Sequence, residues 1–308
     1  MPLNNDHPEY VWMDGKIVDW DQAHIPILSH ALHYGTGIFE GIRAYPIKND
    51  LLIFRLEDHI KRMFESAKIY YIDIGYDLND FRSSIIDLIR KNNLKGRTYI
   101  RPITYVGYGG IGLNFTGFPI HTAICTVKFE NYFEKDGLNA CTSSWRRISD
   151  SSTPPLAKAT GNYINSVLAK LESLKNGYDE AILLDHEGFV SEGSAENIFL
   201  VKDNEIHTPP ISSSILNGIT RDTIIKLATD LKINVVERNI SRTELYTCDE
   251  AFFTGTAAEV TSILEIDHRK IKNGKTGKIT SKLRKSYQDL VHGRNKKYSD
   301  WLTSVYLD

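Results

Sequence analysis

Short β-prone runs alternate with segments of helical periodicity along the whole chain, and this alternation limits the fold more than any other feature. In the first half, apolar residues recur at helical spacing over 56–67 and 81–89. Runs rich in β-branched and aromatic residues predict strands over 97–106 and 121–127, and Asp14-Gly15 predicts a tight hairpin turn. The first half is therefore expected to mix α and β elements.

The second half shows the same mixture. Strands are predicted over 181–184, 197–201, 233–236 and 251–254, and helices over 163–174, 220–231 and 281–290. The 308 residues are enough for two domains of ordinary size. Because Phe129–Gly137 loses clear periodicity, we expect a small N-terminal α/β domain over 1–128, an interdomain loop over 129–137 and a large C-terminal α/β domain over 138–308.

Composition and charge favour a small-molecule partner. Lysine and arginine total 37 against 39 for aspartate and glutamate, which gives no broad reason to expect nucleic acid or a membrane surface. The three cysteines are far apart, lack paired metal-ligand spacing and are odd in number, so no metal site is expected and a reducing cytoplasm fits best. No basic leader and no apolar stretch of membrane-spanning length is seen, which predicts a soluble, unexported, cytoplasmic protein.

The glycine-rich segment Gly107–Gly112 matches the dinucleotide-binding pattern and follows a predicted strand. That pattern needs a helix to begin at its last glycine, and the residues 113–119 are not helix-starting. We therefore interpret the segment as a loop between two strands, with a loop that lines a substrate pocket as the functional alternative.

Lys158 is a candidate nucleophile. Its neighbours in 154–163 are mostly small or apolar and would leave an ammonium group poorly solvated. Burial lowers the pKa of a lysine, and a neutral amine can attack the aldehyde of pyridoxal phosphate to form a Schiff base. Taken alone, the segment is more typical of an ordinary surface lysine.

Three further segments could serve the same cofactor. Glu192 follows a predicted turn and could place a carboxylate on a pyridine nitrogen, although a solvated turn glutamate is the alternative. Residues 217–222 open a predicted helix, whose free N–H groups favour phosphate, and Thr220 could either add a contact or merely cap the helix. Residues 255–258 could form a second turn of N–H donors or a plain strand exit.

Seven segments, in this order, resemble the fold-type IV pyridoxal-phosphate enzymes, and most closely the branched-chain amino acid aminotransferases. The resemblance spans nearly the whole chain and implies their two-domain α+β fold, the D-amino-acid aminotransferase-like fold. The segments are Ser29–Thr36, Phe39–Arg43, Tyr99–Pro102, the Lys158 and Glu192 segments, Leu216–Asp222 and Gly255–Glu259.

The resemblance implies a role for each candidate in cofactor binding. Lys158 would carry the cofactor and then move the proton between the substrate Cα and the cofactor. Glu192 would pair with the pyridine nitrogen, and Tyr163 would donate a hydrogen bond to the phenolic oxygen. The phosphate would be held by Arg62, Ile219, Thr220 and Thr256, and Leu216 is a further cofactor-binding candidate. Only the family match singles out Arg62, because on a helical projection it lies off the apolar face and would pass for a solvated arginine.

For the substrate, the resemblance implies that the Thr256 and Ala257 amides and Tyr99 receive the α-carboxylate. Arg101 would help when the second carboxylate of glutamate occupies the pocket. The remaining substrate-binding candidates are Tyr34, Phe39, Gly41, Leu113, Phe129 and Tyr132. The implied reaction is ping-pong transamination between leucine, isoleucine or valine and 2-oxoglutarate, which gives 2-oxo acids and L-glutamate, with the cofactor cycling through pyridoxamine phosphate.

Some positions depart from the family pattern: Phe129 replaces a common tryptophan, Thr160 a glycine and Asn217 a proline. These departures bear on substrate range and not on reaction type. The family also implies a homodimer, or a higher oligomer built from dimers, in which a loop of one subunit borders the site of the other.

Two relatives share the fold and the lysine, namely D-amino acid aminotransferases and aminodeoxychorismate lyases. The segments Tyr99–Pro102 and Gly255–Ala258 favour the branched-chain type over both. A non-catalytic binding module is a third hypothesis, and it predicts the loss of Lys158 or Glu192, which are both present.

Overall fold

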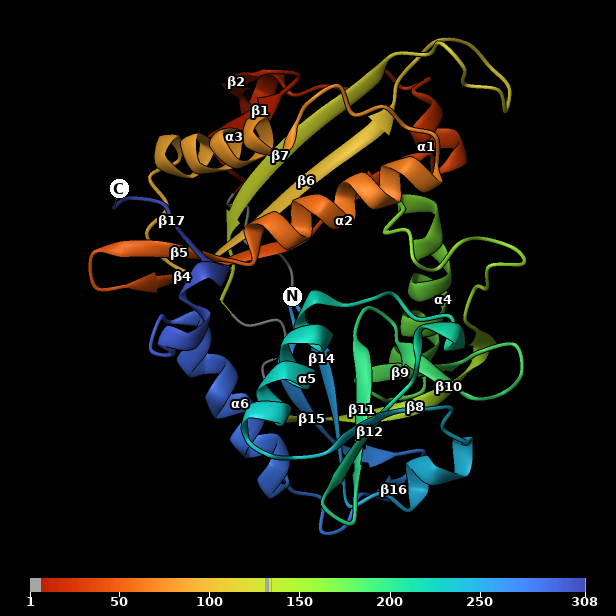
Figure 1. Ribbon diagram of the computed structural model, residues 1–308. Helices are drawn as coiled ribbons and strands as arrows, with labels where there is room; N and C mark the ends of the chain where they lie inside the picture. Colours follow the sequence, from red (N-terminus) through yellow and green to blue (C-terminus); the bar gives the residue numbers. More distant parts are fainter. Residues whose placement is uncertain (1–6, 131–132, 134, 308) are drawn as a thin grey trace. The chain divides into compact units, whose positions relative to one another are not determined.

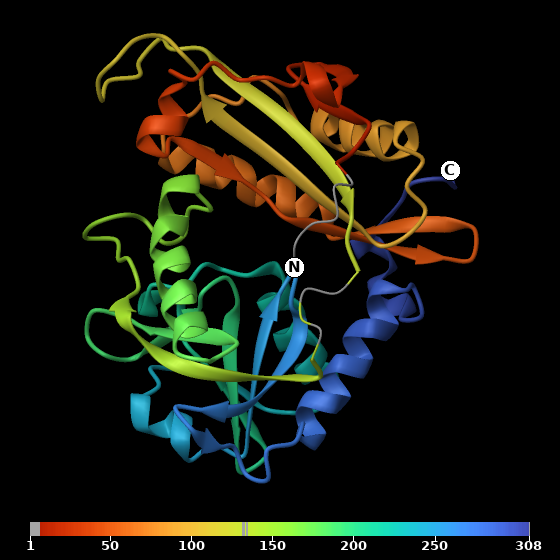
Figure 2. The same ribbon diagram turned by 180° about the vertical axis from the view of Figure 1, so that it is seen from behind.

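The computed structural model describes residues 7–130, 133 and 135–307. Their contacts form two compact units, each of which is described by itself (Figures 1 and 2). Unit 1 contains the residues up to Glu130, the short segment Ala157–Gly161 and the residues from Leu290 onward; unit 2 contains the rest. The division predicted from sequence placed 157–161 and the last segment in the C-terminal domain. Both lie in unit 1 because each pairs with its strands: Ala159 bridges Ile38, and β17 pairs with β5.

Unit 1 is built on one sheet whose described strand pairs are all antiparallel. Among the described residues its strand order is β17-β5-β4-β6-β7-β1-β2, with β3 also paired to β6. The strands are β1 (Tyr10–Met13), β2 (Lys16–Asp19), β3 (Gly37–Phe39), β4 (Ile42–Ile47), β5 (Asp50–Phe54), β6 (Thr98–Val106), β7 (Ile120–Lys128) and β17 (Leu302–Ser304). The helices are η1 (Trp20–Gln22), α1 (His30–Tyr34), α2 (Leu56–Ile69), α3 (Leu78–Lys91) and η5 (Lys296–Trp301).

Helices α2 and α3 supply most of the helical side of the unit 1 core. Ile60 and Met63 of α2 and Ile85 of α3 are buried in one cluster with sheet residues such as Ile100. Asp77 and Asp80 form a reciprocal capping box at the start of α3, which satisfies two of the amide groups that a helix leaves without internal partners. The long strands β6 and β7 pair with each other, and α2 and α3 lie beside them (Figure 1).

Asp50, at the start of β5, holds the last described segment of the chain in unit 1. Its carboxylate accepts hydrogen bonds from the Ser304 hydroxyl (2.6 Å) and from the amides of Val305 (3.2 Å) and Tyr306 (2.7 Å). Burial alone would raise the pKa of Asp50, but these hydrogen bonds more than reverse that effect, so the pKa lies below its usual value. Both views show the blue segment beside the β4–β5 hairpin (Figures 1 and 2).

Unit 2 is built on a second sheet, of mixed direction. Its strand order among the described residues is β10-β9-β8-β15-β14-β11-β12-β13, with β16 paired to β15. The strands are β8 (Gly137–Arg146), β9 (Glu180–Leu184), β10 (Val190–Gly193), β11 (Asn197–Lys202), β12 (Glu205–Thr208), β13 (Val235–Glu237), β14 (Glu250–Gly255), β15 (Glu259–Ile266) and β16 (Arg269–Lys270). The helices are η2 (Thr160–Asn162), α4 (Tyr163–Lys175), η3 (Ile211–Ser213), α5 (Ile219–Asp230), η4 (Arg242–Tyr246) and α6 (Lys278–Val291); η2 and α6 begin or end in unit 1.

Helix α4 packs against unit 2 through its small side chains, and its large apolar side chains are exposed. Ser166, Ala169 and Ser173 are buried, and Ala169 clusters with Ala181 and Leu183 of β9. The exposed side chains are spaced along one face of the helix and are Ile164, Val167, Leu168, Leu171 and Leu174. An apolar face of this kind on a folded unit typically marks an interaction surface.

The mixed α/β fold class and the predicted long elements are confirmed. The helices predicted over 56–67, 163–174 and 220–231 correspond to α2, α4 and α5, whose ends differ by one or two residues, and the strand predicted over 233–236 begins two residues later. The strands that were not predicted are β3, β4, β5, β8, β10, β12, β15, β16 and β17. None of the helices in the described part of the chain is long and apolar enough to cross a membrane.

Candidate active site

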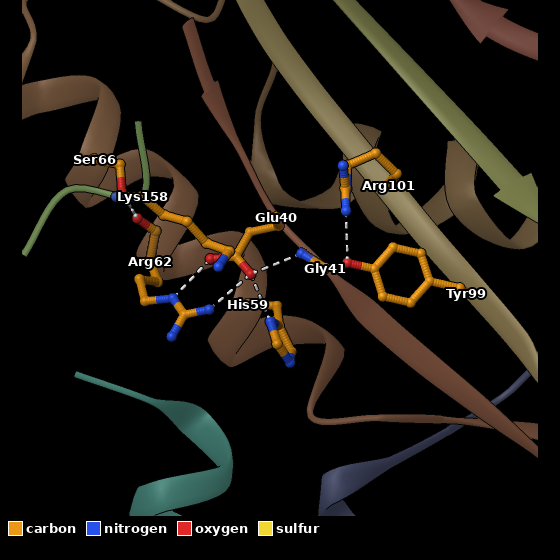
Figure 3. Close-up of polar contacts among 8 residues, drawn as sticks. All are labelled: Glu40, Gly41, His59, Arg62, Ser66, Tyr99, Arg101 and Lys158. Carbon is orange, nitrogen blue, oxygen red and sulfur yellow. Dashed lines mark hydrogen bonds and ion pairs between the residues drawn. The ribbon is translucent and has the colours of Figure 1, made fainter. Parts of the chain in front are cut away.

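The backbone of Lys158 is held on both sides within unit 1. Its amide donates a hydrogen bond to the Ser66 hydroxyl of α2 (3.0 Å, Figure 3), and its carbonyl accepts one from the Phe39 amide (3.0 Å). The side chain is partly buried, and its Nζ lies 5.0 Å from the centre of the Phe39 ring. The structure therefore fixes the direction in which the amine extends, as a nucleophile requires.

The segment after Lys158 is tied to the loop before β3. The Thr160 hydroxyl donates to the carbonyls of Gly35 (2.8 Å) and Gly37 (3.2 Å), and the Gly161 amide donates to Gly35 (3.1 Å). Gly35 has φ +67°, and a Cβ there would lie 2.8 Å from the Gly161 Cα, so only glycine fits. Thr160, where the family pattern has glycine, thus adds hydrogen bonds that glycine cannot make.

Tyr99 and Arg101 of β6 form a polar pair next to Gly41. Arg101 Nη2 donates to the Tyr99 hydroxyl (2.8 Å, Figure 3). The guanidinium also lies 4.8 Å from the centre of the Phe39 ring. A Cβ at Gly41 would lie 2.1 Å from the Tyr99 hydroxyl oxygen. The absence of a side chain at Gly41 therefore makes room for the Tyr99 ring.

Phe129 is placed beside this pair by a buried arginine. The Arg43 guanidinium donates to the backbone carbonyls of Phe129 (3.2 Å) and Glu130 and lies 5.2 Å from the centre of the Phe129 ring. The rings of Tyr99 and Phe129 are 5.3 Å apart. The structure thus brings Phe39, Gly41, Tyr99, Arg101, Phe129 and Lys158, which the sequence nominated separately, into one region of unit 1.

Arg62 corrects an expectation. Its helical position suggested a solvated side chain, but only 11% of it is exposed and it forms a two-pronged ion pair with fully buried Glu40. Alone, burial would raise the pKa of Glu40; the charges of Arg62 and His59 outweigh it, so the carboxyl has a pKa well below its usual range. Burial lowers the pKa of His59, and the nearby Glu40 charge opposes this shift.

In unit 2, Glu192 is buried and held by one ion pair and two hydrogen bonds. Its carboxylate pairs with the Arg147 Nε (2.8 Å) and accepts hydrogen bonds from the Asn197 side-chain amide (3.1 Å) and the Leu216 backbone amide (3.0 Å). The interpretation as a solvated turn glutamate is therefore wrong. The carboxylate instead faces one cation and two N–H donors.

The second acidic residue of this segment, Glu196, lies in a different environment. Burial raises the pKa of Glu196, and the negative charge of buried Glu180 adds to the increase. A raised pKa favours the neutral acid, whereas a partner for a pyridinium nitrogen must be ionised. The surroundings therefore favour Glu192 over Glu196 for that role.

The N-terminus of α5 has the form expected of an anion site. The N-cap is Gly218, without a side-chain capping bond, so Thr220 is the second helical residue and not the cap. Ile219 and Thr220 are buried, and their amides belong to the first turn, where donors lack helical partners. Thr256 and Ala257 lie in the turn between β14 and β15 and are partly exposed.

Three nominated residues stand apart from these clusters. Tyr34 is 42% exposed at the end of α1, and Leu113 is 80% exposed in the loop between β6 and β7. The Tyr34 ring lies tilted against His30, with the ring centres 4.5 Å apart, and His30 hydrogen-bonds the carbonyl of Gly112 (2.9 Å), the residue before Leu113. Tyr163 is the first residue of α4 and is partly buried, whereas Tyr132 lies outside the described residues.

Sequence reasoning assigned no role to Glu40, His59, Ser66 or Arg147. Glu40 lay inside a motif already quoted, between two nominated residues, so its position was the available signal. His59 and Ser66 lie three before and four after Arg62 on α2, which is the spacing of one helical face. Nothing in the local sequence marks Arg147, since its partner Glu192 is far along the chain.

The residues fit pyridoxal phosphate. The chain presents a lysine with a fixed backbone, a buried carboxylate paired with an arginine, and a helix N-terminus whose N-cap makes no side-chain bond. The lysine amine can react with the aldehyde of the cofactor, the carboxylate can pair with its pyridinium nitrogen, and the helix N–H groups can bind its phosphate. Fold and site together define a pyridoxal-phosphate-dependent enzyme.

Comparison with known proteins gives the family. Residues 37–266 match the amino-transferase class IV family. A branched-chain-amino-acid aminotransferase of Pseudomonas aeruginosa is 44% identical over 97% of this chain and 98% of its own. The solved branched-chain aminotransferase of Thermoproteus uzoniensis with norvaline has a TM-score of 0.94 and 45% identity, covering 97% of this chain and 100% of that one.

A second solved structure bears on the cofactor. The branched-chain amino acid aminotransferase of Thermobaculum terrenum, solved in its PLP-form, has a TM-score of 0.93 and 38% identity, covering 98% of this chain and 99% of that one. The chain belongs to the class IV aminotransferases. Pyridoxal phosphate is the cofactor of this family.

Proposed function

We propose that this protein is a branched-chain-amino-acid aminotransferase that transfers the amino group of L-leucine, L-isoleucine or L-valine to 2-oxoglutarate by a ping-pong mechanism. The observation that carries the proposal is the clamped backbone of Lys158 in the same unit as the Tyr99–Arg101 pair. The near full-length similarity to branched-chain aminotransferases supports the substrate class.

Lys158 would hold the cofactor and serve as the acid–base group. Bound pyridoxal phosphate supplies an aldehyde for the amino group and a ring that accepts the electron pair of the substrate Cα–H bond. Lys158 Nζ, once released, takes the proton from Cα. Since the Lys158 amide and carbonyl are both hydrogen-bonded, the amine pivots about a fixed point and can serve in both roles.

Further residues would contact the cofactor ring and its phosphate. Glu192, ion-paired with Arg147, would hold the pyridine nitrogen, and Tyr163 would donate to the phenolic oxygen. The phosphate would be bound by Arg62 and by donors at the α5 N-terminus and the β14–β15 turn. These donors are Ile219, Thr220 and Thr256, with Leu216 beside Glu192.

The substrate contacts explain how one pocket could accept both an aliphatic chain and a carboxylate. Tyr99 and the amides of Thr256 and Ala257 would receive the α-carboxylate, with Gly41 leaving room for the tyrosine. Arg101 rests on the Phe39 and Tyr99 rings through cation–π contacts, so its charge stays stabilised when an apolar side chain is bound. When glutamate binds, the same guanidinium would pair with the second carboxylate.

We further propose a cytoplasmic homodimer, or a higher oligomer built from dimers. The exposed apolar face of α4 supports a subunit interface. Tyr34 and Leu113 are exposed, and His30 contacts both the Tyr34 ring and the carbonyl of Gly112, which precedes Leu113; this supports a role at the border of the partner's site. The three free thiols support a reducing compartment.

The test is the absorption spectrum of the purified protein during its two half-reactions. L-leucine is expected to bleach the visible cofactor band and 2-oxoglutarate to restore it, and Lys158→Ala is expected to abolish both responses. Lys68→Ala, on the exposed side of α2, is the matched control and should behave as wild type. A response to D-leucine alone would indicate a D-amino acid aminotransferase, and pyruvate release from aminodeoxychorismate without an acceptor would indicate a lyase.

A further inference from the structure

Glu40 has no part in the functions proposed above, yet it is the most completely enclosed acidic group near Lys158. It lies between β3 and β4 and has no exposed surface. Its carboxylate accepts from Arg62 Nε (2.7 Å) and Nη2 (2.8 Å), from His59 Nδ1 (2.7 Å) and from the Gly41 amide (3.2 Å) (Figure 3). Both carboxylate oxygens are thereby occupied.

The geometry of the Arg62 contact sets the orientation of the guanidinium. Two N–H groups on one edge of a planar guanidinium meet two oxygens of a planar carboxylate, an arrangement that fixes the plane as well as the distance. His59 then holds the carboxylate from a second direction. Because burial restricts all three side chains, Arg62 cannot rotate away without breaking several hydrogen bonds.

The same helix, α2, also holds Lys158, through a separate contact. The buried Ser66 hydroxyl, one turn after Arg62, accepts from the Lys158 amide and donates to the Arg62 carbonyl (2.9 Å). A change at Glu40 therefore releases the Arg62 side chain while the backbone clamp on Lys158 keeps its own hydrogen bonds. Lysine attachment and phosphate binding can be disturbed one at a time.

We propose that Glu40 is a positioning residue that, with His59 behind it, orients the Arg62 guanidinium toward the phosphate of the cofactor. This inference rests on the phosphate role proposed for Arg62. It makes Glu40 act only through Arg62 and only on ligands that carry a phosphate.

Charge alone predicts the opposite sign. Removal of a negative charge beside Arg62 makes the region more positive, which by itself would strengthen the binding of an anionic phosphate. Loss of orientation would instead weaken it, as occurs when the outer partners of a ligating side chain are removed. The direction of the change in affinity thus separates orientation from charge balance.

The experiment is a set of titrations of the cofactor-free full chain with pyridoxal phosphate and with pyridoxal, followed by protein fluorescence. Glu40→Gln is expected to weaken pyridoxal phosphate binding about 10-fold or more and to leave pyridoxal binding unchanged. In an Arg62→Ala background, the same substitution is expected to have no further effect, as required of a residue that acts through Arg62. Glu65→Gln, an identical change on the exposed side of α2, is the control and should change neither affinity.

Glu40→Asp keeps the charge and shortens the side chain, so it tests geometry without a change of charge, and it also serves if Glu40→Gln does not fold. It is expected to weaken pyridoxal phosphate binding selectively as well. The inference is overturned if either variant binds pyridoxal phosphate as tightly as wild type or more tightly, or loses pyridoxal to the same degree. If Arg62→Ala itself binds normally, the phosphate role of Arg62 fails too, whereas a weakened Arg62→Ala beside a normal Glu40→Gln overturns the inference alone.

Discussion

At the scale of single residues, the site depends on two positions that act on a neighbouring side chain. One lacks a side chain, and the other has a buried carboxylate. Gly41 is one, because the volume that its side chain would fill belongs to the Tyr99 ring. Glu40 is another, because its buried charge gives Arg62 an orientation. Neither residue is required to touch the reacting atoms for the chemistry to depend on it.

Gly41→Ala is expected to reduce kcat/KM for L-leucine by about 10- to 100-fold, because the added methyl group displaces the Tyr99 hydroxyl and separates it from Arg101. Steady-state kinetics and a thermal melt measure the two consequences, and the melting temperature should change little. Gly96→Ala is the matched control, since a Cβ there meets nothing within 4 Å. An unchanged kcat/KM would show that Tyr99 does not receive the substrate carboxylate.

The sequence alone allowed Lys158 and Glu192 to be nominated, but not their supports. The residues around Lys158 and the order of the seven segments can be read directly from the sequence, whereas contacts between distant residues cannot. Arg62 looked solvated because its partner Glu40 is 22 positions away and on another element. The pairing exists only after α2 packs on the sheet, so helical periodicity could not reveal it.

At the scale of elements, periodicity predicted the long helices, whereas hydrogen bonding between distant segments created the elements that were missed. Helices α2 and α3 have clear apolar faces that predict them in advance. Strands β3 and β4 are short and flank Glu40-Gly41, and β4 also contains Pro46, so no run of β-prone residues marks them. Their strand geometry comes from pairing with β6.

Asp50→Asn is expected to loosen the segment that follows η5, because the amide cannot replace an ionised acceptor of four hydrogen bonds. At pH 7, hydrogen exchange of the Val305 and Tyr306 amides should become about 10-fold faster or more, in line with a charged hydrogen bond of about 1.5–3 kcal/mol. Asp87→Asn, exposed on α3, is the control.

The pH dependence of this tie has a definite sign. The folded pKa of Asp50 lies below the ordinary value of 3.8, so the stabilisation is present above that pH and is lost as the pH falls through the folded value. The difference in exchange between wild type and Asp50→Asn should therefore shrink below pH 3.8. A difference that stayed constant there would show that the charge of Asp50 is not the cause.

At the scale of the whole molecule, the crossing of the chain between units is the feature that the sequence did not predict. Residues 157–161 belong to unit 1 although unit 2 residues precede and follow them. Their assignment depends on the bridge between Ile38 and Ala159 and on Ser66, which are contacts across a long stretch of chain. A loss of periodicity near 129–137 indicated the first crossing but could not indicate the others.

Introducing charge on the exposed face of α4 tests the proposed dimer. Val167→Asp with Leu171→Glu is expected to shift the protein from dimer to monomer, because burying an unpaired carboxylate in an interface is costly. Light scattering after size exclusion gives the mass at several concentrations. Ile211→Glu, an exposed apolar residue elsewhere in unit 2, should remain dimeric. A double variant of unchanged mass would place the interface on another surface.

The pairing of β17 with β5 also sets an order of events during protein synthesis. Strand β17, which covers the outer edge of β5, leaves the ribosome long after β5 does, since Asp50 and Val305 are 255 positions apart. Until then, a strand composed of Leu51, Leu52, Ile53 and Phe54 has an unpaired edge, which is a template for aggregation. In a stalled or shortened nascent chain, the rest of the unit 1 sheet could therefore form while the outer edge of β5 stayed unpaired. Chaperones act on intermediates of this kind.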